Sequence, residues 1–167
     1  MIERQKKILK LLDVSGPRLH RLLARLTRQE DVVGDLVQDL FIRLWNSKGF
    51  DKADDPFAYA YRAAINLAFE WRRRQQIRRQ PLEGNCPVAQ QNPSALGKMI
   101  EAEELEQVLD ATSRLSDLAR DVVVMRYIEQ DSYEGIAEQL GKKPQHIRSL
   151  CSKAMARLRE LLASEKV

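Results

Sequence analysis

Apolar residues recur at intervals of three and four along most of the chain, which is the spacing of a helix with one buried face. The most regular stripe lies between Asp31 and Asn46 and predicts one helix over this segment. Its apolar positions are Val33, Leu36, Val37, Leu40, Phe41 and Leu44. Asp31 suits the N-cap of this helix, because its carboxylate can accept from free backbone N–H groups. Ser47-Lys48-Gly49 follows, and Gly49 suits the left-handed position that ends many helices.

Two shorter helices are predicted before this stripe and one long helix after it. Residues 2–12 and 18–28 are amphipathic, and Ser15-Gly16-Pro17 between them predicts a break. Asp54-Asp55-Pro56 predicts the start of a new helix, since an acid suits the cap and proline suits the first turn. That helix runs to about Arg79, and it is first rich in alanine and aromatic residues and then in arginine.

The second half of the chain is also helical in pattern, and a linker separates it from the first half. Residues 80–97 have no helical period and contain three prolines and two glycines. Beyond this linker the pattern predicts helices over 98–111, 116–128, 132–140 and 144–163. No segment of strand length alternates between apolar and polar residues.

The segment from Asp131 to Leu150 has the pattern of a helix-turn-helix. A short helix ends at Gly141, and Pro144 opens a longer one. The second helix of such a motif lies in the DNA major groove, where polar side chains contact phosphates and base edges. Its candidate groove face consists of Gln145, His146, Arg148, Ser149, Ser152 and Lys153. The same pattern also fits an ordinary helical hairpin with a polar outer face.

Together these patterns predict an all-α fold of two small helical domains joined by a flexible linker. We expect the N-terminal domain to span residues 1–80, the linker 81–98 and the C-terminal domain 99–167. The helix-turn-helix lies in the C-terminal domain.

The formal charge of +4 on 167 residues conceals three zones of alternating sign. Residues 1–80 carry a net charge of +7, residues 81–140 one of −8 and residues 141–167 one of +5. Two basic zones suggest two separate contacts with a polyanion, although solvated helix faces would give the same distribution. The acidic zone between them is unsuited to lying on DNA.

Cysteine content and hydropathy indicate a cytoplasmic protein without membrane insertion. Cys86 and Cys151 are far apart, which argues against a disulfide scaffold and against a structural zinc site. No apolar run approaches the roughly 18 residues that a membrane span needs. The N-terminus also lacks the uninterrupted apolar segment of a signal peptide.

Aromatic residues and arginines follow one another along the helix predicted over residues 56–79. Phe57, Tyr61 and Phe69 recur at helical spacing and therefore suit the core, but Tyr61 also suits contact with a base. The run that begins Arg72-Arg73-Arg74 is not expected in the core. Arginines beside aromatic residues suit unstacked, single-stranded nucleic acid.

The chain shows none of the residue patterns that mark a catalytic site. Its two histidines, His20 and His146, stand in no metal-binding motif. A glycine-rich phosphate loop and a nucleophile motif are also missing from the sequence. We expect no enzymatic activity, no metal and no cofactor.

Three segments occur in an order that resembles the extracytoplasmic-function (ECF) sigma factors of bacterial RNA polymerase. The segment from Asp31 to Trp45 resembles the second conserved region of sigma factors. The segment from Pro56 to Arg74 resembles the promoter-melting segment beside it, and Leu115 to Leu162 resembles the fourth region. The resemblance covers nearly the whole chain apart from the N-terminal dozen residues and the linker.

This resemblance implies a protein that binds RNA polymerase core and directs it to promoters. In the family, one face of the second region binds the β′ clamp helices, and the implied residues are Asp35, Leu36, Gln38 and Asp39. The N-terminal domain reads and melts the −10 element, and the implied residues are Phe50, Phe57, Tyr61, Asn66, Arg73 and Arg74. The candidate groove face would read the −35 element. The β flap of the polymerase and an anti-sigma factor are further implied partners.

Two other functions remain open at this point. A freestanding helix-turn-helix regulator, with the N-terminal half for sensing or dimerisation, would bind duplex DNA tightly without polymerase. It would need neither the Asp35-Gln38-Asp39 set nor the segment from Asn66 to Arg74. An enzyme acting on nucleic acid is more distant, because it would have to build its site without a visible nucleophile, metal cluster or phosphate loop.

Overall fold

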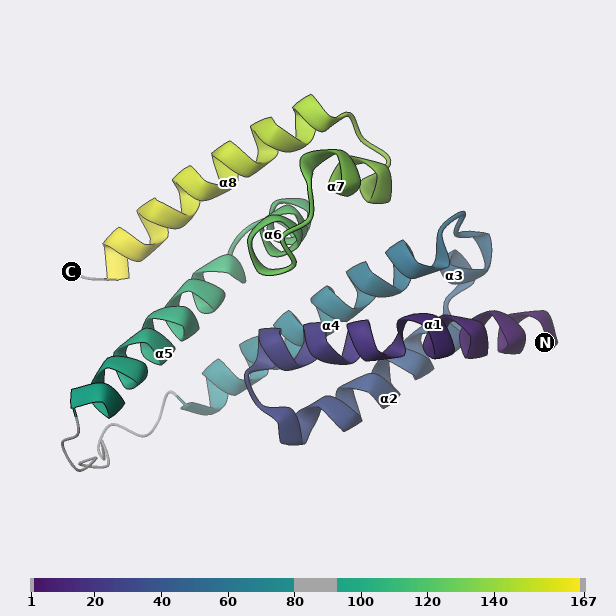
Figure 1. The fold of residues 1–167 in the computed structure, drawn as a ribbon, viewed down its shortest axis with the longest axis horizontal. Coiled ribbons are helices and arrows are strands. Elements are labelled where there is room, and N and C mark those ends of the chain that lie inside the picture. The colour runs from purple at the N-terminus through teal and green to yellow at the C-terminus, as the bar shows by residue number, and fades with distance from the viewer. Residues whose placement is uncertain (1, 80–92, 166–167) are drawn as a thin grey trace.

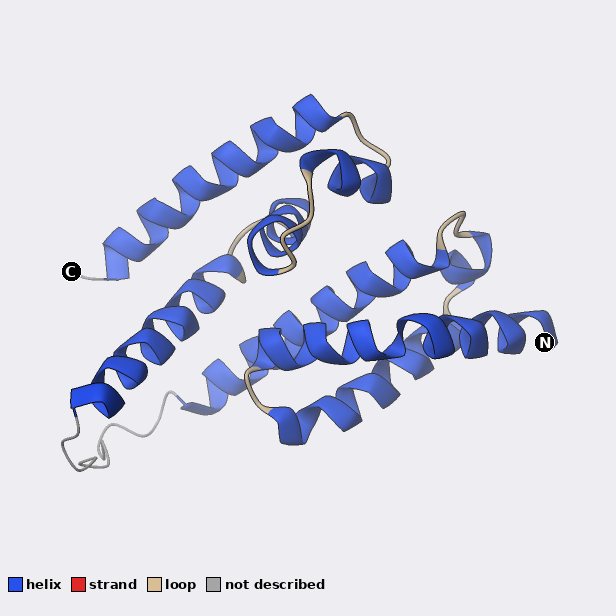
Figure 2. Ribbon diagram, in the orientation of Figure 1, coloured by secondary structure: helices blue, strands red, loops and turns tan. Residues whose placement is uncertain are grey.

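The computed structural model describes residues 2–79 and 93–165, with side chains for 2–78 and 101–165, and every element in these ranges is helical (Figure 2). The all-α prediction is therefore confirmed. We call the first four helices the N-terminal domain: α1 (Ile2–Thr27), α2 (Glu30–Asn46), α3 (Lys48–Lys52) and α4 (Pro56–Arg79). The C-terminal domain consists of α5 (Pro93–Thr112), α6 (Asp117–Val123), the π-helical turn η1 (Val124–Ile128), α7 (Tyr133–Leu140) and α8 (Pro144–Glu165).

Three long helices, α1, α2 and α4, pack together in the N-terminal domain (Figure 1). Leu22 of α1, Leu40 of α2 and Ile65 of α4 are each 3% exposed or less and belong to one hydrophobic core. Full burial of such a side chain contributes about 1.5–3 kcal/mol to stability. The apolar stripe of α2 is therefore the side of this helix that faces its two neighbours.

Helix α1 is continuous from Ile2 to Thr27, so the predicted break at Ser15-Gly16-Pro17 is wrong. Proline inside a helix costs about 3 kcal/mol, because it removes a hydrogen bond and crowds the preceding turn. Buried Leu11 precedes the proline and buried Leu19 follows it, and both lie in the same core. Packing on both sides of the proline offsets its cost and keeps α1 in one piece.

The ends of α2 also differ from the prediction. The N-cap is Gln29, which makes no side-chain capping bond, and Asp31 lies in the first turn. Ser47 ends α2 and also caps α3, where its Oγ accepts from the backbone N–H of Phe50 at 3.2 Å. Gly49 is inside α3 and does not adopt a left-handed conformation. A single turn of helix thus follows α2 at the position where Gly49 was expected to end the helix.

Gly49→Ala is expected to destabilise the protein by about 1–3 kcal/mol, which is typical of overpacking. A Cβ at Gly49 would stand 2.8 Å from the Tyr59 hydroxyl, which is held by a 2.6 Å hydrogen bond to Ser47 Oγ. Gly34→Ala on α2 is the control, because a Cβ there meets no atom within 4 Å. Alanine in a helix interior is favoured over glycine by up to about 1 kcal/mol. The melting temperature should fall for Gly49→Ala and rise for Gly34→Ala. Shifts of the same sign in both variants would contradict the close contact between Gly49 and Tyr59.

The remaining helix boundaries agree with the sequence except at α5 and α6. Asp55 caps α4 as predicted, since its Oδ1 accepts from the backbone N–H of Phe57 at 3.0 Å. Helix α5 begins at Pro93, earlier than the predicted residue 98, while residues 80–92 lie outside the described residues. The helix predicted over 116–128 is α6 followed by the π-helical turn η1.

Helices α7 and α8 form the predicted helix-turn-helix. Ser132 caps α7 by accepting from the backbone N–H of Gly135 at 3.0 Å. Gly141 ends α7 with φ of 65°, the left-handed conformation that glycine adopts without strain. Ile136 on α7 and Ile147 on α8 are fully buried between the two helices and the rest of the domain.

The two domains share one hydrophobic core, which the sequence did not predict. Leu109, Val122 and Met125 of the C-terminal domain belong to the same buried cluster as Leu22 and Phe69 of the N-terminal domain. In Figure 1 the C-terminal domain lies along α1 and α4, and α4 contacts α6 directly. The expected two domains on a linker are thus packed against each other.

Candidate nucleic-acid interface

The outward side of α2 presents carboxylate and amide groups. Its exposed side chains are Asp35, Gln38 and Asp39. Leu36, predicted to act with them, is 4% exposed and packs in the core, so it holds the face in position from below. Arg43 donates to the Glu70 carboxylate of α4 at 2.6 Å, and this hydrogen bond lowers the pKa of Glu70. The exposed face of Asp35, Gln38 and Asp39 therefore lies on a helix that the Arg43–Glu70 pair joins to α4.

The junction between α2 and α4, which carries the implied −10 residues Phe50 and Phe57, is tied to the start of α1. Phe50 is fully buried, with its ring 5.9 Å from that of Tyr59. Lys7 Nζ donates to the Phe50 carbonyl at 2.8 Å, and Arg4 pairs with the Asp51 carboxylate. An open hollow of about 880 Å³ beside this junction is lined by Glu3, Arg4, Lys6, Lys7, Lys10, Trp45 and Asp51.

The aromatic residues of α4 divide between the core and its edge. Tyr61 is fully buried, and burial raises the pKa of its hydroxyl. Phe57 is half-buried with its ring 5.6 Å from that of Tyr61, and the Arg18 guanidinium lies over Phe57 at 4.8 Å. Of the two roles left open for Tyr61, its position is that of a core residue. Tyr61 and Phe50 can act on DNA only through the side chains that they support.

Asn66 faces a hollow of about 670 Å³ between α4 and the C-terminal domain. The α4 side of this hollow includes Tyr59, Arg62 and Asn66, and the opposite side includes Arg120, Asp121 and Gln139. The Asn66 amide donates to Glu70 Oε1 at 3.4 Å. The residue expected to contact unstacked DNA therefore lines the hollow between the two domains, with its amide bonded to its own helix.

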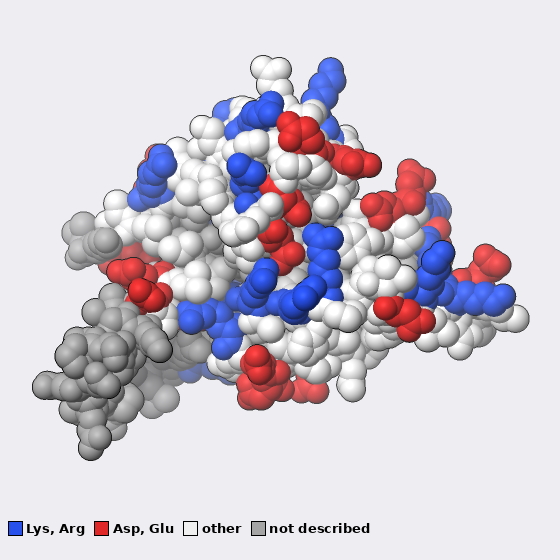
Figure 3. Space-filling model, in the orientation of Figure 1, with Lys and Arg blue, Asp and Glu red and all other residues white. Residues whose placement is uncertain are grey.

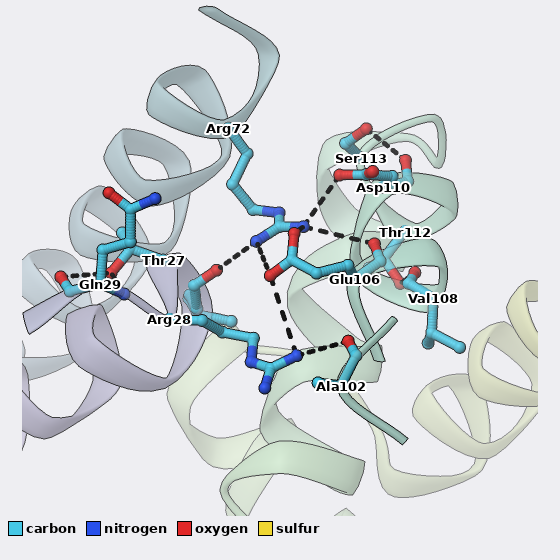
Figure 4. A network of polar contacts seen from close by, with 11 residues as sticks. Thr27, Arg28, Gln29, Arg72, Ala102, Glu106, Val108, Asp110, Thr112 and Ser113 are labelled. Atoms are coloured by element: carbon cyan, nitrogen blue, oxygen red, sulfur yellow. Dashed lines mark hydrogen bonds and ion pairs between the residues drawn. The ribbon is translucent and has the colours of Figure 1, made fainter. Parts of the chain in front are cut away.

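Arg72, the first residue of the arginine run, is only 3% exposed. Its guanidinium donates to the Leu26 carbonyl at 3.0 Å and to the carboxylates of Glu106 at 2.7 Å and Asp110 at 2.8 Å (Figure 4). The prediction that this run stays out of the core is wrong for Arg72, because two carboxylates and a carbonyl replace water around its charge. Both carboxylates belong to α5, in the other domain.

Arg73 and Arg74 are exposed, as predicted for cations that follow a DNA backbone. Arg73 nevertheless donates to the Ser113 carbonyl at 3.1 Å, so one nitrogen of its guanidinium is bound to the C-terminal domain. Arg74 lies 3.9 Å from the Glu70 carboxylate, a loose and solvated pair.

The first turns of α8 carry the candidate groove face. Its six side chains, Gln145, His146, Arg148, Ser149, Ser152 and Lys153, are all exposed. Arg148 donates to the Glu134 carboxylate of α7 at 2.9 Å and lies 5.3 Å from the ring of Tyr133. Because that pair is exposed, it is worth at most about 1 kcal/mol and does not hold Arg148 back from DNA.

Comparison with known proteins finds two conserved regions in this order. The family model of Sigma-70 region 2 matches residues 11–78, and that of Sigma-70 region 4 matches residues 111–160. RNA polymerase sigma-E factor of Streptomyces avermitilis is 32% identical over 133 residues, which are 78% of this chain and 70% of that protein. ECF RNA polymerase sigma factor SigK of Mycobacterium sp. strain KMS is 26% identical over 143 residues, 83% of this chain and 74% of that protein. The chain belongs to the ECF sigma factors.

The fold of this sigma factor is similar to that of a solved sigma factor. Sigma factor RpoE of Bartonella quintana, solved with the anti-sigma factor NepR, superposes with a TM-score of 0.50 at 21% identity. The match covers 95% of this chain and 98% of that one, and it concerns the fold alone. Within residues 2–79 and 93–165, no helix is long and apolar enough to cross a membrane.

Sigma factors direct RNA polymerase to promoters, and they are DNA-binding initiation factors rather than enzymes. The predicted function in promoter-specific initiation is therefore confirmed. A freestanding regulator is not favoured, because it does not account for the region 2 match over α1 to α4.

Sequence reasoning missed the contact between the domains of this sigma factor. Glu106 and Asp110 bind the arginine run, yet they lie between the two matched regions. The available signal was the charge of −8 over residues 81–140 beside a domain of charge +7. Opposite charges of this size favour contact within one chain as well as a surface that avoids DNA.

Proposed function

We propose that this sigma factor binds core polymerase through α2, reads and melts the −10 element with its N-terminal domain, and reads the −35 element with α8. The observation that carries this proposal is the exposed face of Asp35, Gln38 and Asp39 inside the region 2 match. Hydrated carboxylates suit pairing with cations on a partner protein. A protein that only binds DNA has no use for such a face.

The −10 element is assigned to Asn66, Arg73 and Arg74, together with the junction that Phe50, Phe57 and Tyr61 support. Extruding a base from the duplex costs a few kcal/mol, which a shaped pocket and backbone contacts must offset. Arginines along the displaced strand add affinity that depends on salt and not on sequence. This cluster and the groove face of α8 belong to different domains, which suits the reading of two separate promoter elements.

We further propose an anti-sigma partner and a cytoplasmic location beside the polymerase. Support for the partner comes from the Bartonella quintana structure, in which a sigma factor of this fold is in complex with the anti-sigma factor NepR. Purification of the tagged chain from stressed and unstressed cells of its own species should yield a dedicated inhibitor. Absence of such a protein under every condition would overturn this part.

Reconstituted transcription tests the main proposal. Bacterial core polymerase and this chain are combined on genomic DNA, and the transcript ends are mapped. Specific initiation that requires both components is expected. Absence of any specific start site would overturn the proposal, whereas tight duplex binding by the chain alone would support the freestanding regulator.

Arg148→Ala is expected to weaken promoter binding by the polymerase holoenzyme by about 1–3 kcal/mol and to lower the salt slope by about one. The cause is the loss of a cation on the exposed groove face of α8. Arg159→Ala serves as the control, because Arg159 is an exposed arginine three turns further along the same helix. Binding to duplex promoter DNA is measured over a salt series, and equal affinities for the two variants would mean that α8 is not oriented as proposed.

A further inference from the structure

Helix α3 is too short to hold its own position in the N-terminal domain. It has five residues, Lys48–Lys52, and an isolated helix shorter than about 12 residues is marginal in water. Its buried residue is Phe50. On the side of α4, the Tyr59 hydroxyl lies 2.6 Å from Ser47 Oγ, and the same Oγ caps the start of α3. The place of α3 therefore depends on its contacts with neighbouring helices.

The first turns of α1 hold the other end of α3. Lys7 Nζ donates to the carbonyls of Phe50 at 2.8 Å and of Asp51 at 3.4 Å, and it lies 4.9 Å from the centre of the Phe50 ring. These carbonyls belong to the last turn of α3, where backbone oxygens have few partners within the helix and favour a cation. Lys7 is therefore a C-terminal cap of α3.

Arg4 joins α1 to both α2 and α3. Its guanidinium donates to both carboxylate oxygens of Asp51, with Nε 2.7 Å from Oδ1. It also donates at 2.6 Å to the carbonyl of Trp45, which lies in the last turn of α2. Arg4 and Lys7 are three residues apart and so lie on the same face of α1. Two cations on one helix face thus bind the C-terminal ends of two successive helices.

These two cations lie outside the part of the chain that the region 2 match covers. The match begins at residue 11, whereas α3 and the end of α2 lie inside it. Figure 3 shows basic and acidic side chains together at the end of the molecule where α1 begins. The side chains of Arg4 and Asp51 are 29% and 38% exposed, and such a pair adds little to the stability of a whole domain. Its effect therefore falls on the position of α3.

Helix α3 connects the helix assigned to the polymerase with the helix assigned to the −10 element. The chain passes directly from α2 through α3 to α4. Because the Phe50 ring lies 5.9 Å from that of Tyr59, a shift of α3 changes the surface beside the start of α4. Lys48 and Lys52 are exposed on α3 and move with it. A pocket that receives an extruded base must keep its shape to distinguish one base from another.

We propose that Arg4 and Lys7 are positioning residues for the −10 element. By capping α2 and α3 they hold the junction in the shape that receives and distinguishes an extruded base. Neither residue needs to touch DNA, because each acts through α3. This proposal rests on the proposed function, since it assumes that the junction between α2 and α4 takes part in reading the −10 element.

Binding to core polymerase should not depend on this contact. The face of Asp35, Gln38 and Asp39 lies on an earlier part of α2, which buried Leu36 and Leu40 hold in the core. Loss of the caps is therefore expected to change the reading of DNA and to leave core binding unchanged.

A charge swap between Arg4 and Asp51 tests the proposal in the full chain. The variants are Arg4→Glu, Asp51→Arg and the two combined, which restores opposite charges at the pair. Lys6→Glu is the matched control, because Lys6 lines the same hollow and the substitution makes the same change of charge as Arg4→Glu. Among the described residues, Lys6 has no hydrogen bond or ion pair with α2 or α3.

The measurement compares the affinities of holoenzymes for different −10 sequences. Core polymerase with each variant is bound to a forked promoter DNA in which the −10 element is unpaired. The promoter is one that reconstituted transcription with the wild-type chain has mapped. Fluorescence anisotropy gives the affinity for the native −10 sequence and for single-base substitutions in it, and their ratio is the discrimination. Titration with core polymerase measures core binding separately.

Arg4→Glu is expected to lower the discrimination about tenfold, because one good base contact is worth about that factor. The combined variant is expected to recover at least about threefold of this loss, as coupled residues do. Lys6→Glu should discriminate as the wild type does. Core binding should be equal in all these variants.

Unchanged discrimination in Arg4→Glu would overturn the proposal, and so would a combined variant that discriminates no better than Arg4→Glu. An equal loss of affinity for every −10 sequence would show that Arg4 binds the DNA backbone directly, which also overturns the positioning role. Circular dichroism verifies the fold of each variant. If Arg4→Glu is not folded, Lys7→Met, which keeps most of the side chain and removes its charge, must show the same loss or the proposal fails.

The wild-type holoenzyme separates this proposal from the proposed function. If the wild type initiates specifically and Arg4→Glu discriminates −10 sequences equally well, only the positioning role is wrong. If the wild type initiates at no specific site, the proposed function is wrong, whatever the variants show.

Discussion

Asp39→Arg is expected to abolish binding to core RNA polymerase while leaving the fold of the free protein intact. Asp39 is exposed on the outward side of α2 and belongs to the face assigned to the polymerase. Reversing its charge places like charges against each other in the complex, which costs several kcal/mol. Every 1.4 kcal/mol is tenfold in affinity, so a loss of at least about 100-fold is expected. Titration of labelled variant with core polymerase measures it.

The control for Asp39→Arg is Asp13→Arg, which reverses an exposed carboxylate on α1. This variant should bind core polymerase as the wild type does. Circular dichroism of both variants verifies the fold. Retention of core binding by Asp39→Arg would show that the polymerase uses another face of the chain.

Arg120→Ala is expected to cause the largest loss of stability, about 3–5 kcal/mol, because it breaks a buried ion pair. Arg120 is 1% exposed, donates to the Asp121 carboxylate at 3.1 Å and lies over the ring of Phe69 at 5.3 Å. Its removal leaves Asp121 buried, and among the described residues Arg62 is then its remaining ion-pair partner, at 3.4 Å. The comparison is Arg114→Ala, since Arg114 forms an exposed pair with Glu165 that is worth at most about 1 kcal/mol. Urea unfolding should separate the two variants clearly.

The loss of unfolding free energy caused by Arg120→Ala should become smaller in mildly acidic buffer. Burial raises the pKa of Asp121 even though Arg120 and Arg62 lower it, and loss of Arg120 raises that pKa further. An acid with a raised pKa in the folded state destabilises the fold when it is ionised. Stability is regained as the pH falls through the raised pKa toward the ordinary value of 3.8. A deficit that grows on acidification would contradict this account of Asp121.

The features of this structure that could be predicted from sequence are those that depend on residues close together in the chain. The apolar stripe of α2 fixed which side carries Asp35, Gln38 and Asp39, because helical spacing determines a face directly. Asp55 and Gly141 were predicted correctly for the same reason, since a cap and a left-handed turn depend on neighbouring residues. The candidate groove face of α8 likewise follows from its spacing.

Features that depend on distant residues were predicted wrongly or not at all. Pro17 predicts a break in the helix, but core residues on both sides of it keep α1 continuous. Gly49 signals a helix end, but the following residues form another turn whose Phe50 is buried. Arg72 signals an exposed cation, and only the carboxylates of Glu106 and Asp110 make its burial tolerable. No local pattern records which distant partner a side chain will meet.

The pairing of Arg72 has a consequence for the distribution of this sigma factor in the cell. A chromosome offers about 10⁶–10⁹ non-specific sites, and arginines without partners would bind them through the release of counterions. In this molecule the guanidinium of Arg72 already has two carboxylate partners, so binding to arbitrary DNA releases fewer ions and breaks existing contacts. Arg72 itself therefore contributes little to retention of the protein on arbitrary DNA.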